Sequence, residues 1–344
     1  MTRAPRATAP AIVFRADASH AIGLGHVARL TAVIEDLAAV GARPIALFGG
    51  DDAATAWMRH HGLAGAIKPW TVDELLEAAG GPGVRAVVLD GPAVVAEAAP
   101  ALAARGVRTV VIDDRGDLAL AVDAVVNHNF HAPALAAGYP AARHRLLGRR
   151  YLMLRRGIRR YPHGACRPRT GSRLRVVLSF GGSDPVGATV RTLQQFPSER
   201  PADLIVLTGP GFRDAYDLQR AAATAAAAGH TVDLVRDPGD PAGVFVHADA
   251  AICAAGGTLG ELAYLGCPAL GFAIVPDQLA SAHSQRRSGL IAGGDAWHAL
   301  DDAALRAQLR GFLLDDRGRL DLRDHALATA DGGGAERIVT EALG

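Results

Sequence analysis

The chain of 344 residues is longer than one ordinary domain and predicts two. Its hydrophobic fraction of 49% and charged fraction of 21% are typical of a globular protein with substantial buried cores. The net charge of +1 gives no overall field that would attract nucleic acid or an anionic membrane, so we expect neither as a partner.

Hydropathy and cysteine usage favour a cytoplasmic location. The longest uncharged apolar stretch, residues 262–276, is too short to span a bilayer, and the opening segment MTRAPRATAP lacks the apolar core of a signal peptide. The three cysteines, Cys166, Cys253 and Cys267, are scattered and odd in number, which suits reduced thiols.

Short apolar runs alternate with amphipathic stretches along the first half of the chain. The predicted strands are 11–15, 43–48, 84–89 and 107–112, and the predicted helices are 25–40 and 53–61. Each of the last two strands stops at an aspartate. Strands separated by helices imply parallel βαβ units.

A basic stretch divides the chain. Residues 149–175 hold ten arginines, two prolines and no Asp or Glu, which is typical of a solvated connector between domains; phosphate binding is the alternative. The alternation then resumes, with strands at 175–180, 204–208, 231–235, 250–254 and 269–274 and helices at 213–228, 258–265, 278–288 and from about 301. A further helix is predicted with Asp184 as its N-cap and Pro185 as its first residue.

The pattern predicts an α/β protein of two Rossmann-like domains that face each other across a cleft. We place the N-terminal domain at 1–155, an Arg-rich linker at 156–174 and the C-terminal, nucleotide-binding domain at 175–344. In open parallel sheets, ligands bind outside the carboxyl ends of the strands, so the loops there are the candidate site.

The loop after the first strand carries the first candidate site. In FRADASHAIGLGHVAR (residues 14–29), a Gly-x-Gly precedes a helix whose first turn carries His26, and Arg29 lies on the same helix face. The glycines let a ligand approach backbone N–H groups at the positive end of the helix, and an imidazole there can act as a general base. Asp17 makes the loop more polar than a simple helix start requires.

Two other interpretations of this loop compete. The spacing G-x-G-x-x-A from Gly23 to Ala28 matches a dinucleotide fingerprint, but the Rossmann version begins directly after the strand, whereas seven residues separate Arg15 from Gly23. In the other interpretation, His26 caps or packs the start of the helix. The spacing alone does not decide between that role and catalysis.

A second glycine-rich loop, AAGGTLGE (residues 254–261), follows an apolar strand and opens a helix. Its glycines leave N–H groups free at the helix start, where a diphosphate fits. Glu261, which we place in the first helical turn, is suited to accept hydrogen bonds from ribose hydroxyls. Favourable placement of an acid near a helix N-terminus explains it equally well.

Several ordered motifs resemble the nucleotide-sugar hydrolase family of pseudaminic acid biosynthesis, which removes UDP from UDP-2,4-diacetamido-2,4,6-trideoxy-β-L-altropyranose. That family includes spore-coat polysaccharide proteins and shares the two-Rossmann GT-B architecture of glycosyltransferases. The likeness extends from about Ile12 to the helix after Gln278, and FRADASHAIGLGHVAR is its most specific element. The other matching segments are Asp113-Asp114, VVNHNF around Asn127 and Asn129, Tyr151–Arg155, LSFGGSDP (178–185) and AAGGTLGELAYLG (254–266).

The resemblance implies roles for individual residues. His26 falls on the family's catalytic histidine, which activates or orients the attacking water, and Asp17 falls on the conserved aspartate of the same motif. The expected sugar-binding residues are Gly25, Arg29, Asp114, Asp277 and Gln278, and the expected nucleotide-binding residues are Gly182, Ser183, Gly256, Gly257, Thr258 and Glu261. The roles of Asp113 and Asp114 stay open between loop capping and sugar binding.

Three positions depart from the family's pattern. Asp277 replaces the asparagine of an Asn-Gln pair, Pro92 replaces an aromatic residue, and Gly157 replaces an acidic one. A carboxylate in place of an amide removes two hydrogen-bond donors, so these departures concern the identity of the sugar more than the reaction type.

The resulting expectation is an enzyme that hydrolyses a nucleotide-activated deoxy or amino sugar, with UDP or another nucleoside diphosphate as the leaving group. A GT-B glycosyltransferase is the first alternative; a non-catalytic nucleotide-sugar-binding protein and an epimerase are the others. We expect a small-molecule nucleotide sugar as the partner, and no cofactor or metal. The close histidine pairs, His60-His61 and His128 with His131, lack cysteine or a convincing acid at ligand spacing.

Overall fold

The computed structural model describes residues 9–19, 23–60, 62–63 and 67–344 and divides the chain into two compact units. Unit 1 comprises Met1–His128, Ala132–Arg155 and Gly333–Gly344, and unit 2 comprises Asn129–His131 and Arg156–Gly332. Most of the opening segment MTRAPRATAP, residues 20–22 of the first motif and the last residue of the helix predicted at 53–61 lie outside the described residues.

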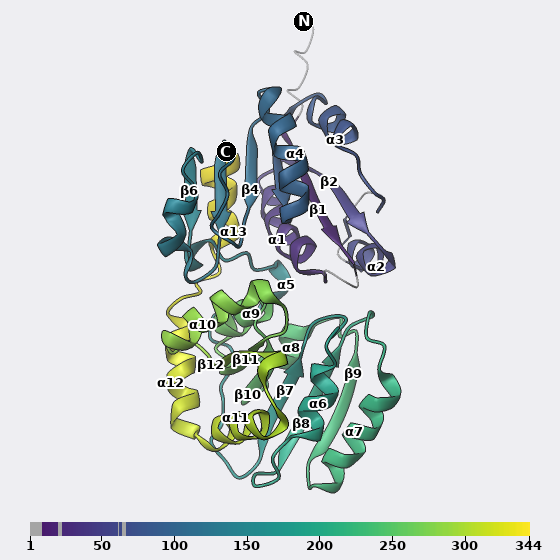
Figure 1. The fold of residues 1–344 in the computed structure, drawn as a ribbon, viewed down its shortest axis with the longest axis vertical. Coiled ribbons are helices and arrows are strands. Elements are labelled where there is room, and N and C mark those ends of the chain that lie inside the picture. Colours follow the sequence, from purple (N-terminus) through teal and green to yellow (C-terminus); the bar gives the residue numbers. More distant parts are fainter. Residues whose placement is uncertain (1–8, 20–22, 61, 64–66) are drawn as a thin grey trace, which may run out of the picture. The chain divides into compact units, whose positions relative to one another are not determined.

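Unit 1 is built on a parallel sheet with the strand order β2-β1-β3-β4-β5-β6 (Figure 1). Its strands are β1 (Ala11–Ala18), β2 (Arg43–Gly50), β3 (Val84–Asp90), β4 (Thr109–Ile112), β5 (Ala124–Asn127) and β6 (His144–Leu147). Its helices are α1 (Gly25–Ala39), α2 (Asp52–His60), α3 (Val72–Ala79), α4 (Pro92–Ala104), α13 (Gly334–Ile338) and the short turns η1 (Ala132–Gly138), η2 (Arg149–Tyr151) and η5 (Val339–Leu343). The four predicted strands and helix α1 are confirmed; β5 and β6 were not predicted.

Unit 2 has a second parallel sheet, in the order β12-β11-β10-β7-β8-β9. Its strands are β7 (Leu174–Ser179), β8 (Ala202–Thr208), β9 (Thr231–Arg236), β10 (Ala250–Ala254), β11 (Ala269–Ala273) and β12 (Ala292–Ala296). Its helices are α5 (Arg156–Arg159), α6 (Ala188–Gln194), α7 (Ala215–Ala227), α8 (Pro241–Phe245), α9 (Gly257–Leu265), α10 (Leu279–Arg287), α11 (Asp302–Leu314), α12 (Asp316–Leu327) and the short turns η3 (Pro276–Gln278) and η4 (Trp297–Ala299).

Both sheets reverse their strand order once, and this determines where a ligand fits. In unit 1 the chain leaves β1 for β2 on one side and then crosses to β3 on the other; in unit 2 it leaves β7 for β8 and β9 before it crosses to β10. The crevices outside the carboxyl ends of β1 and β3, and of β7 and β10, are therefore the expected binding positions. The predicted fold class, two Rossmann-like domains, is confirmed.

The second domain does not run to Gly344 as predicted, because residues 333–344 pack on unit 1. Helix α13 contributes Ala335 and Ile338, and η5 contributes Leu343, to the apolar core that also holds one face of α1. The hydroxyl of Tyr151 donates to Glu341 at 2.7 Å and fixes this segment against η2. An amphipathic pattern in the sequence indicates that one face of a helix is buried, but it does not indicate which of the two sheets that face packs against.

The stretch predicted as a linker, 156–174, packs on unit 2 instead of lying free in solvent. The backbone N–H of Cys166 donates to the Leu265 carbonyl at 2.8 Å, and the Cys166 side chain is fully buried. Arg169 forms an ion pair at 3.0 Å with Asp249, which is itself buried. Charged side chains in this stretch thus serve as partners for acids of the second unit.

A glycine where the C-terminal segment meets η2 is expected to be sensitive to substitution. A Cβ added at Gly334 would lie 2.2 Å from the carbonyl oxygen and 2.5 Å from the nitrogen of Leu152, so Gly334→Ala should destabilise the protein by about 1–3 kcal/mol. Gly311, inside α11, has nothing within 4 Å of such a Cβ, so Gly311→Ala should stabilise by about 0.5–1 kcal/mol. Urea unfolding of the two variants tests this; equal effects would contradict it.

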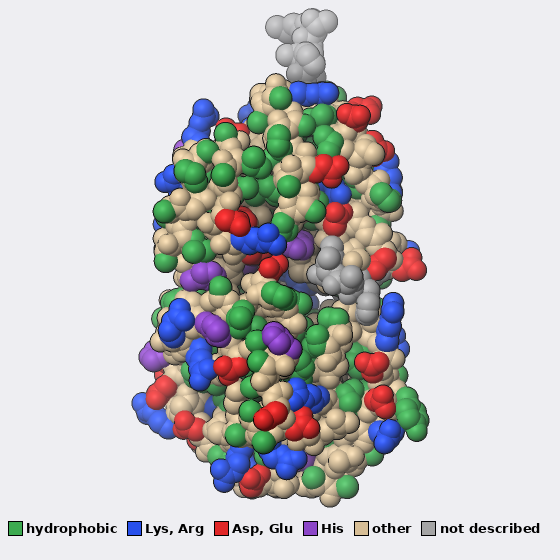
Figure 2. All heavy atoms as spheres, in the orientation of Figure 1, with side chains coloured by type: hydrophobic (Ala, Val, Ile, Leu, Met, Phe, Trp, Pro, Cys, Tyr) green, Lys and Arg blue, Asp and Glu red, His purple; other side chains and the backbone are tan. Residues whose placement is uncertain are grey.

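The surface carries both signs of charge. On the face drawn in Figure 2, Lys and Arg side chains are interspersed with Asp and Glu side chains over each unit, in keeping with the net charge of +1. Within the part of the chain that the structure describes, no helix is long and apolar enough to cross a bilayer.

Candidate functional site

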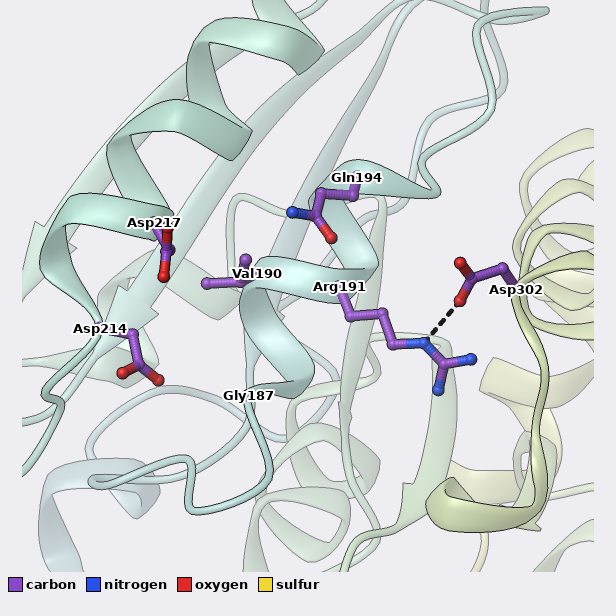
Figure 3. A pocket seen from close by; sticks show the side chains of 7 residues that line it. All are labelled: Gly187, Val190, Arg191, Gln194, Asp214, Asp217 and Asp302. Carbon is purple, nitrogen blue, oxygen red and sulfur yellow. Dashed lines mark hydrogen bonds and ion pairs between the residues drawn. The ribbon is translucent and has the colours of Figure 1, made fainter.

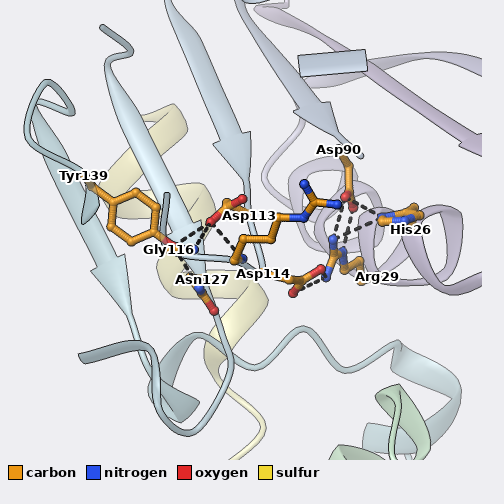
Figure 4. Close-up of polar contacts among 9 residues, drawn as sticks. His26, Arg29, Asp90, Asp113, Asp114, Gly116, Asn127 and Tyr139 are labelled. Atoms are coloured by element: carbon orange, nitrogen blue, oxygen red, sulfur yellow. Dashed lines mark hydrogen bonds and ion pairs between the residues drawn. The ribbon is translucent and has the colours of Figure 1, made fainter. Parts of the chain in front are cut away.

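The strand reversal in unit 1 brings a histidine, an arginine and an aspartate together from distant parts of the sequence. His26 and Arg29 lie in the first turns of α1, which follows β1, and Asp90 is the last residue of β3, the neighbour of β1 in the sheet (Figure 4). This cluster therefore occupies the position at which open α/β sheets bind ligands.

Asp90 orients the imidazole of His26. The Nδ1 atom of His26 lies 2.7 Å from Oδ1 of Asp90, whose side chain is fully buried, while the His26 side chain is 25% exposed. Nδ1 also lies 3.1 Å from the Nη2 donor of Arg29, but the carboxylate, which can only accept, is closer, so we assign the proton to Nδ1 and leave Nε2 as the basic nitrogen. The pair has the geometry of a general base held by a buried acid.

Arg29 neutralises this acid and links it to a second one. Its Nε and Nη2 atoms donate to the two oxygens of Asp90 at 2.7 and 2.6 Å, and its Nη1 donates to both oxygens of Asp114 at 2.8 and 2.9 Å. Burial alone would raise the pKa of Asp90, but the charge and hydrogen bonds of Arg29 outweigh it and lower that pKa; the same balance lowers the pKa of Asp114. The donors of Arg29 are thus used within the protein. This favours a role for Arg29 in positioning Asp90 and argues against the predicted role in binding the sugar.

The two neighbouring aspartates, Asp113 and Asp114, have different partners. Oδ2 of Asp113 accepts from the N–H of Arg115 at 3.0 Å, the N–H of Gly116 at 2.7 Å and the hydroxyl of Tyr139 at 2.7 Å. Asp113 therefore caps its own loop, and this loop presents Asp114 to Arg29.

A buried tyrosine supports that loop from below. Tyr139 is fully buried, and its hydroxyl accepts from Nδ2 of Asn127 at 2.8 Å while it donates to Asp113.

Tyr139→Phe removes both hydrogen bonds and is expected to destabilise the protein by about 1–3 kcal/mol, as measured by urea unfolding. Tyr216 is 73% exposed, so Tyr216→Phe is the control and should change stability little; a Tyr139→Phe variant as stable as this control would contradict the role of the network.

Asp17 lies near the end of β1, and the glycines of the first motif flank the start of α1. Nη1 of Arg15 donates to Oδ1 of Asp17 at 2.5 Å. Gly23 has a φ of +78°, and Gly25 begins α1, whose N-terminus has no side-chain cap. The role of Asp17 in catalysis stays a prediction.

In unit 2 the loop after β10 forms an uncapped helix start. Gly256 is the N-cap of α9 and, as a glycine, offers no side chain to cap the helix, which begins with Gly257 and Thr258. Gln278 lies beside this loop: a Cβ on Gly256 would be 3.3 Å from its Nε2, and its Oε1 accepts from the N–H of Ile274 at 3.0 Å. Asp277 is exposed. Such a helix start can hold an anion through backbone N–H groups.

Two predictions about helix starts in unit 2 are wrong. Glu261 is the fifth residue of α9 and lies beyond its first turn, because the helix begins at Gly257. Helix α6 begins at Ala188, so Asp184 is not its N-cap; Asp184 has a φ of +44°, is buried, and accepts from the N–H groups of Ala188 at 2.9 Å and Thr189 at 2.8 Å. The carboxylate of Asp184 thus accepts N–H groups of the first helical turn from a position four residues before the helix begins.

The loop that carries Gly182 and Ser183 follows β7, next to β10 in the sheet. The backbone of Gly182 lies against Gly209: a Cβ added at Gly209 would be 2.4 Å from the Gly182 Cα. This loop and the Gly256 loop therefore both lie at the carboxyl end of the sheet of unit 2.

A separate hollow of unit 2 does not suit an anion. Its lining comes from one face of α6, the start of α7 and the start of α11 (Figure 3). It contains the carboxylates of Asp214, Asp217 and Asp302, and its one guanidinium, that of Arg191, is paired with Asp302 at 2.8 Å. The carboxylates would repel a diphosphate, so the Gly256 loop is the better candidate.

No family model matches the chain, and no curated protein matches it in sequence. Its fold is nevertheless shared over nearly the whole length with solved structures. MurG of Acinetobacter baumannii is 17% identical over 97% of this chain and 99% of its own, with a TM-score of 0.67. The fold is GT-B.

Two further structures with this fold were solved with nucleotide ligands. The UDP-GlcNAc 2-epimerase from Neisseria meningitidis, bound to UDP-GlcNAc, is 10% identical over 98% of this chain and 100% of its own, with a TM-score of 0.62. The spinosyn rhamnosyltransferase SpnG, complexed with thymidine diphosphate, is 16% identical over 96% of this chain and 99% of its own, also with a TM-score of 0.62. At these identities the likeness shows the fold and not the activity.

Proposed function

We propose that the chain is an enzyme that acts on nucleotide-activated sugars, and specifically a hydrolase that releases a nucleoside diphosphate. The observation that carries this proposal is the imidazole of His26, held by the buried Asp90 at the carboxyl end of the unit 1 sheet. The GT-B fold supports it, because the epimerase and the rhamnosyltransferase named above were solved with a nucleotide sugar and a nucleoside diphosphate.

In this proposal the helix start of unit 2 is assigned to the diphosphate. As the bond between the anomeric carbon and the diphosphate breaks, negative charge grows on the phosphate oxygen. The N–H groups at Gly256, Gly257 and Thr258, at the positive end of α9, are oriented donors that stabilise such charge without reorganisation.

In this proposal the cluster of unit 1 is assigned to the activation of water. Nε2 of His26 removes a proton from water as the water oxygen attacks the anomeric carbon, and the imidazolium that forms is stabilised by the carboxylate of Asp90. Arg29 keeps Asp90 ionised and in position. A single displacement by water opposite the diphosphate inverts the configuration of the anomeric carbon.

Glycosyl transfer is the second candidate, since the rhamnosyltransferase has the same fold. The same residues would then deprotonate an acceptor hydroxyl in place of water. The difference lies in the requirement for an acceptor, because a hydrolase releases nucleotide and free sugar when water alone is present.

The test is incubation of the protein with UDP-, TDP-, GDP- and CMP-sugars, with nucleotide and sugar followed by chromatography. The proposal predicts stoichiometric release of a nucleoside diphosphate and a free sugar from at least one donor without an acceptor. Release only after an acceptor is added would favour transfer, and a donor returned with a changed sugar configuration would favour epimerisation. Tight nucleotide binding with no turnover of any donor would indicate a binding protein.

A further inference from the structure

Arg149, a half-buried arginine, lies at the edge of the unit 1 sheet. Strands β5 and β6 are parallel neighbours, with Asn127 opposite Leu147. The N–H of Gly148 donates to the Asn127 carbonyl at 2.8 Å, and Gly148 turns the chain with a φ of +94°. His128 and Arg149 therefore follow adjoining strand ends, on the carboxyl side where the His26 cluster also lies.

Each of these half-buried side chains has one buried nitrogen that makes no hydrogen bond within the described residues. Nε of Arg149 and Nδ1 of His128 are both buried, and neither has a hydrogen-bond partner in the part of the chain that the structure describes. Other arginines of the same basic stretch are paired: Arg150 with Glu341 at 3.4 Å and Arg169 with Asp249 at 3.0 Å.

Arg149 nevertheless keeps its charge. Burial lowers the pKa of Arg149 to about 10, so the guanidinium stays protonated at neutral pH. Burial, with the positive charge of Arg29, lowers the pKa of His128 to about 4, so that imidazole is neutral. The edge of the sheet thus presents one positive charge and one neutral imidazole.

The nearby acids are already used. Asp90 and Asp114 are both bound by Arg29, and Asp113 accepts from its own loop and from Tyr139. A charge that is partly removed from water is destabilising when no partner faces it, and an anion that arrives with a ligand removes that cost. A guanidinium pairs with carboxylate or phosphate oxygens through two parallel hydrogen bonds.

We propose that Arg149, assisted by His128, binds an anionic group of the substrate, either a carboxylate on the sugar or a phosphate of the nucleotide. The identity of the ligand as a nucleotide sugar rests on the proposed function. The anion site itself does not, because it follows from the two buried nitrogens that lack a partner within the described residues.

Calorimetric titration with UDP, UDP-glucose, UDP-glucuronate and inorganic phosphate tests the proposal in the full chain. Arg149→Gln is compared with Arg150→Gln, a control next to it in sequence whose side chain is 61% exposed. A sugar carboxylate as ligand predicts that Arg149→Gln weakens UDP-glucuronate alone by about 10–100-fold. A phosphate as ligand predicts a similar loss for UDP and for both sugars. Arg150→Gln should bind as the wild type does.

Thermal unfolding without ligand gives a second readout. Removal of a half-buried charge that no acid neutralises should leave the melting temperature of Arg149→Gln equal to or above that of the wild type, whereas loss of a structural ion pair would lower it. The proposal is overturned if Arg149→Gln binds all four probes as the wild type does, if both variants lose affinity equally, if Arg149→Gln melts well below the wild type, or if the wild type binds none of the probes. Because binding is measured without turnover, absence of hydrolysis would overturn only the proposed function.

Discussion

Replacement of His26 by glutamine is expected to slow nucleotide release about 10²–10⁴-fold, which is the usual contribution of a positioned general base. Glutamine is a polar side chain of similar size, but it cannot take up a proton from water at neutral pH. Nucleotide affinity should change little, because the uncapped helix start that we assign to the diphosphate belongs to unit 2.

The measurement is kcat and KM for the best donor of the panel, with His144→Gln as the control. His144 is an exposed residue at the start of β6, the end of the strand opposite the candidate site, so its replacement should leave kcat unchanged. Near-normal turnover by a folded His26→Gln protein would remove the imidazole from the mechanism.

Replacement of Arg29 by methionine is expected to cost about 3–5 kcal/mol of unfolding free energy, because it leaves the fully buried carboxylate of Asp90 without its cation. Methionine keeps the apolar part of the side chain, so the loss reports mainly on charge. Asp90 has a lowered pKa in the folded protein, so its contribution is present above the unfolded value near 4 and is lost as the pH falls further. The difference between variant and wild type should therefore shrink in strong acid.

Arg143→Met is the matched control for urea unfolding at neutral pH. Arg143 pairs with Asp123 at 3.4 Å and is 74% exposed, so its loss should cost at most about 1 kcal/mol. Similar losses in the two variants would show that the pairing of Arg29 with Asp90 contributes no more than a surface ion pair.

The sequence was sufficient to predict the two Rossmann-like folds, because buried β-branched runs and 3.6-residue apolar stripes depend only on near neighbours in the chain. It also indicated His26, since a Gly-x-Gly-His at the start of a helix is a local pattern. Asp90 was within reach, because its strand visibly ends in an aspartate. However, the strand of residues 107–112 is followed by an aspartate in the same way, and Asp113 instead caps a loop. Only the position of β3 next to β1 distinguishes them.

Other features depend on contacts that no local pattern encodes. Glu261 lies one turn further into α9 than predicted because the helix begins at Gly257, a boundary that depends on the backbone conformation of Gly256. Arg149 is one of ten arginines in a basic stretch, and nothing in that stretch shows which of them lacks an acid in the folded protein.

Because residues 333–344 pack on unit 1, unit 2 is a long insertion in the sequence of unit 1. During synthesis the nascent chain must present Ala335, Ile338 and Leu343 before the core around α1 can close, and these emerge after all of unit 2. At ~5–20 residues per second this delay is roughly ten to thirty-five seconds on the ribosome. Unit 1 is therefore synthesised first but completes its core last, and its apolar surface around α1 stays exposed while unit 2 is translated.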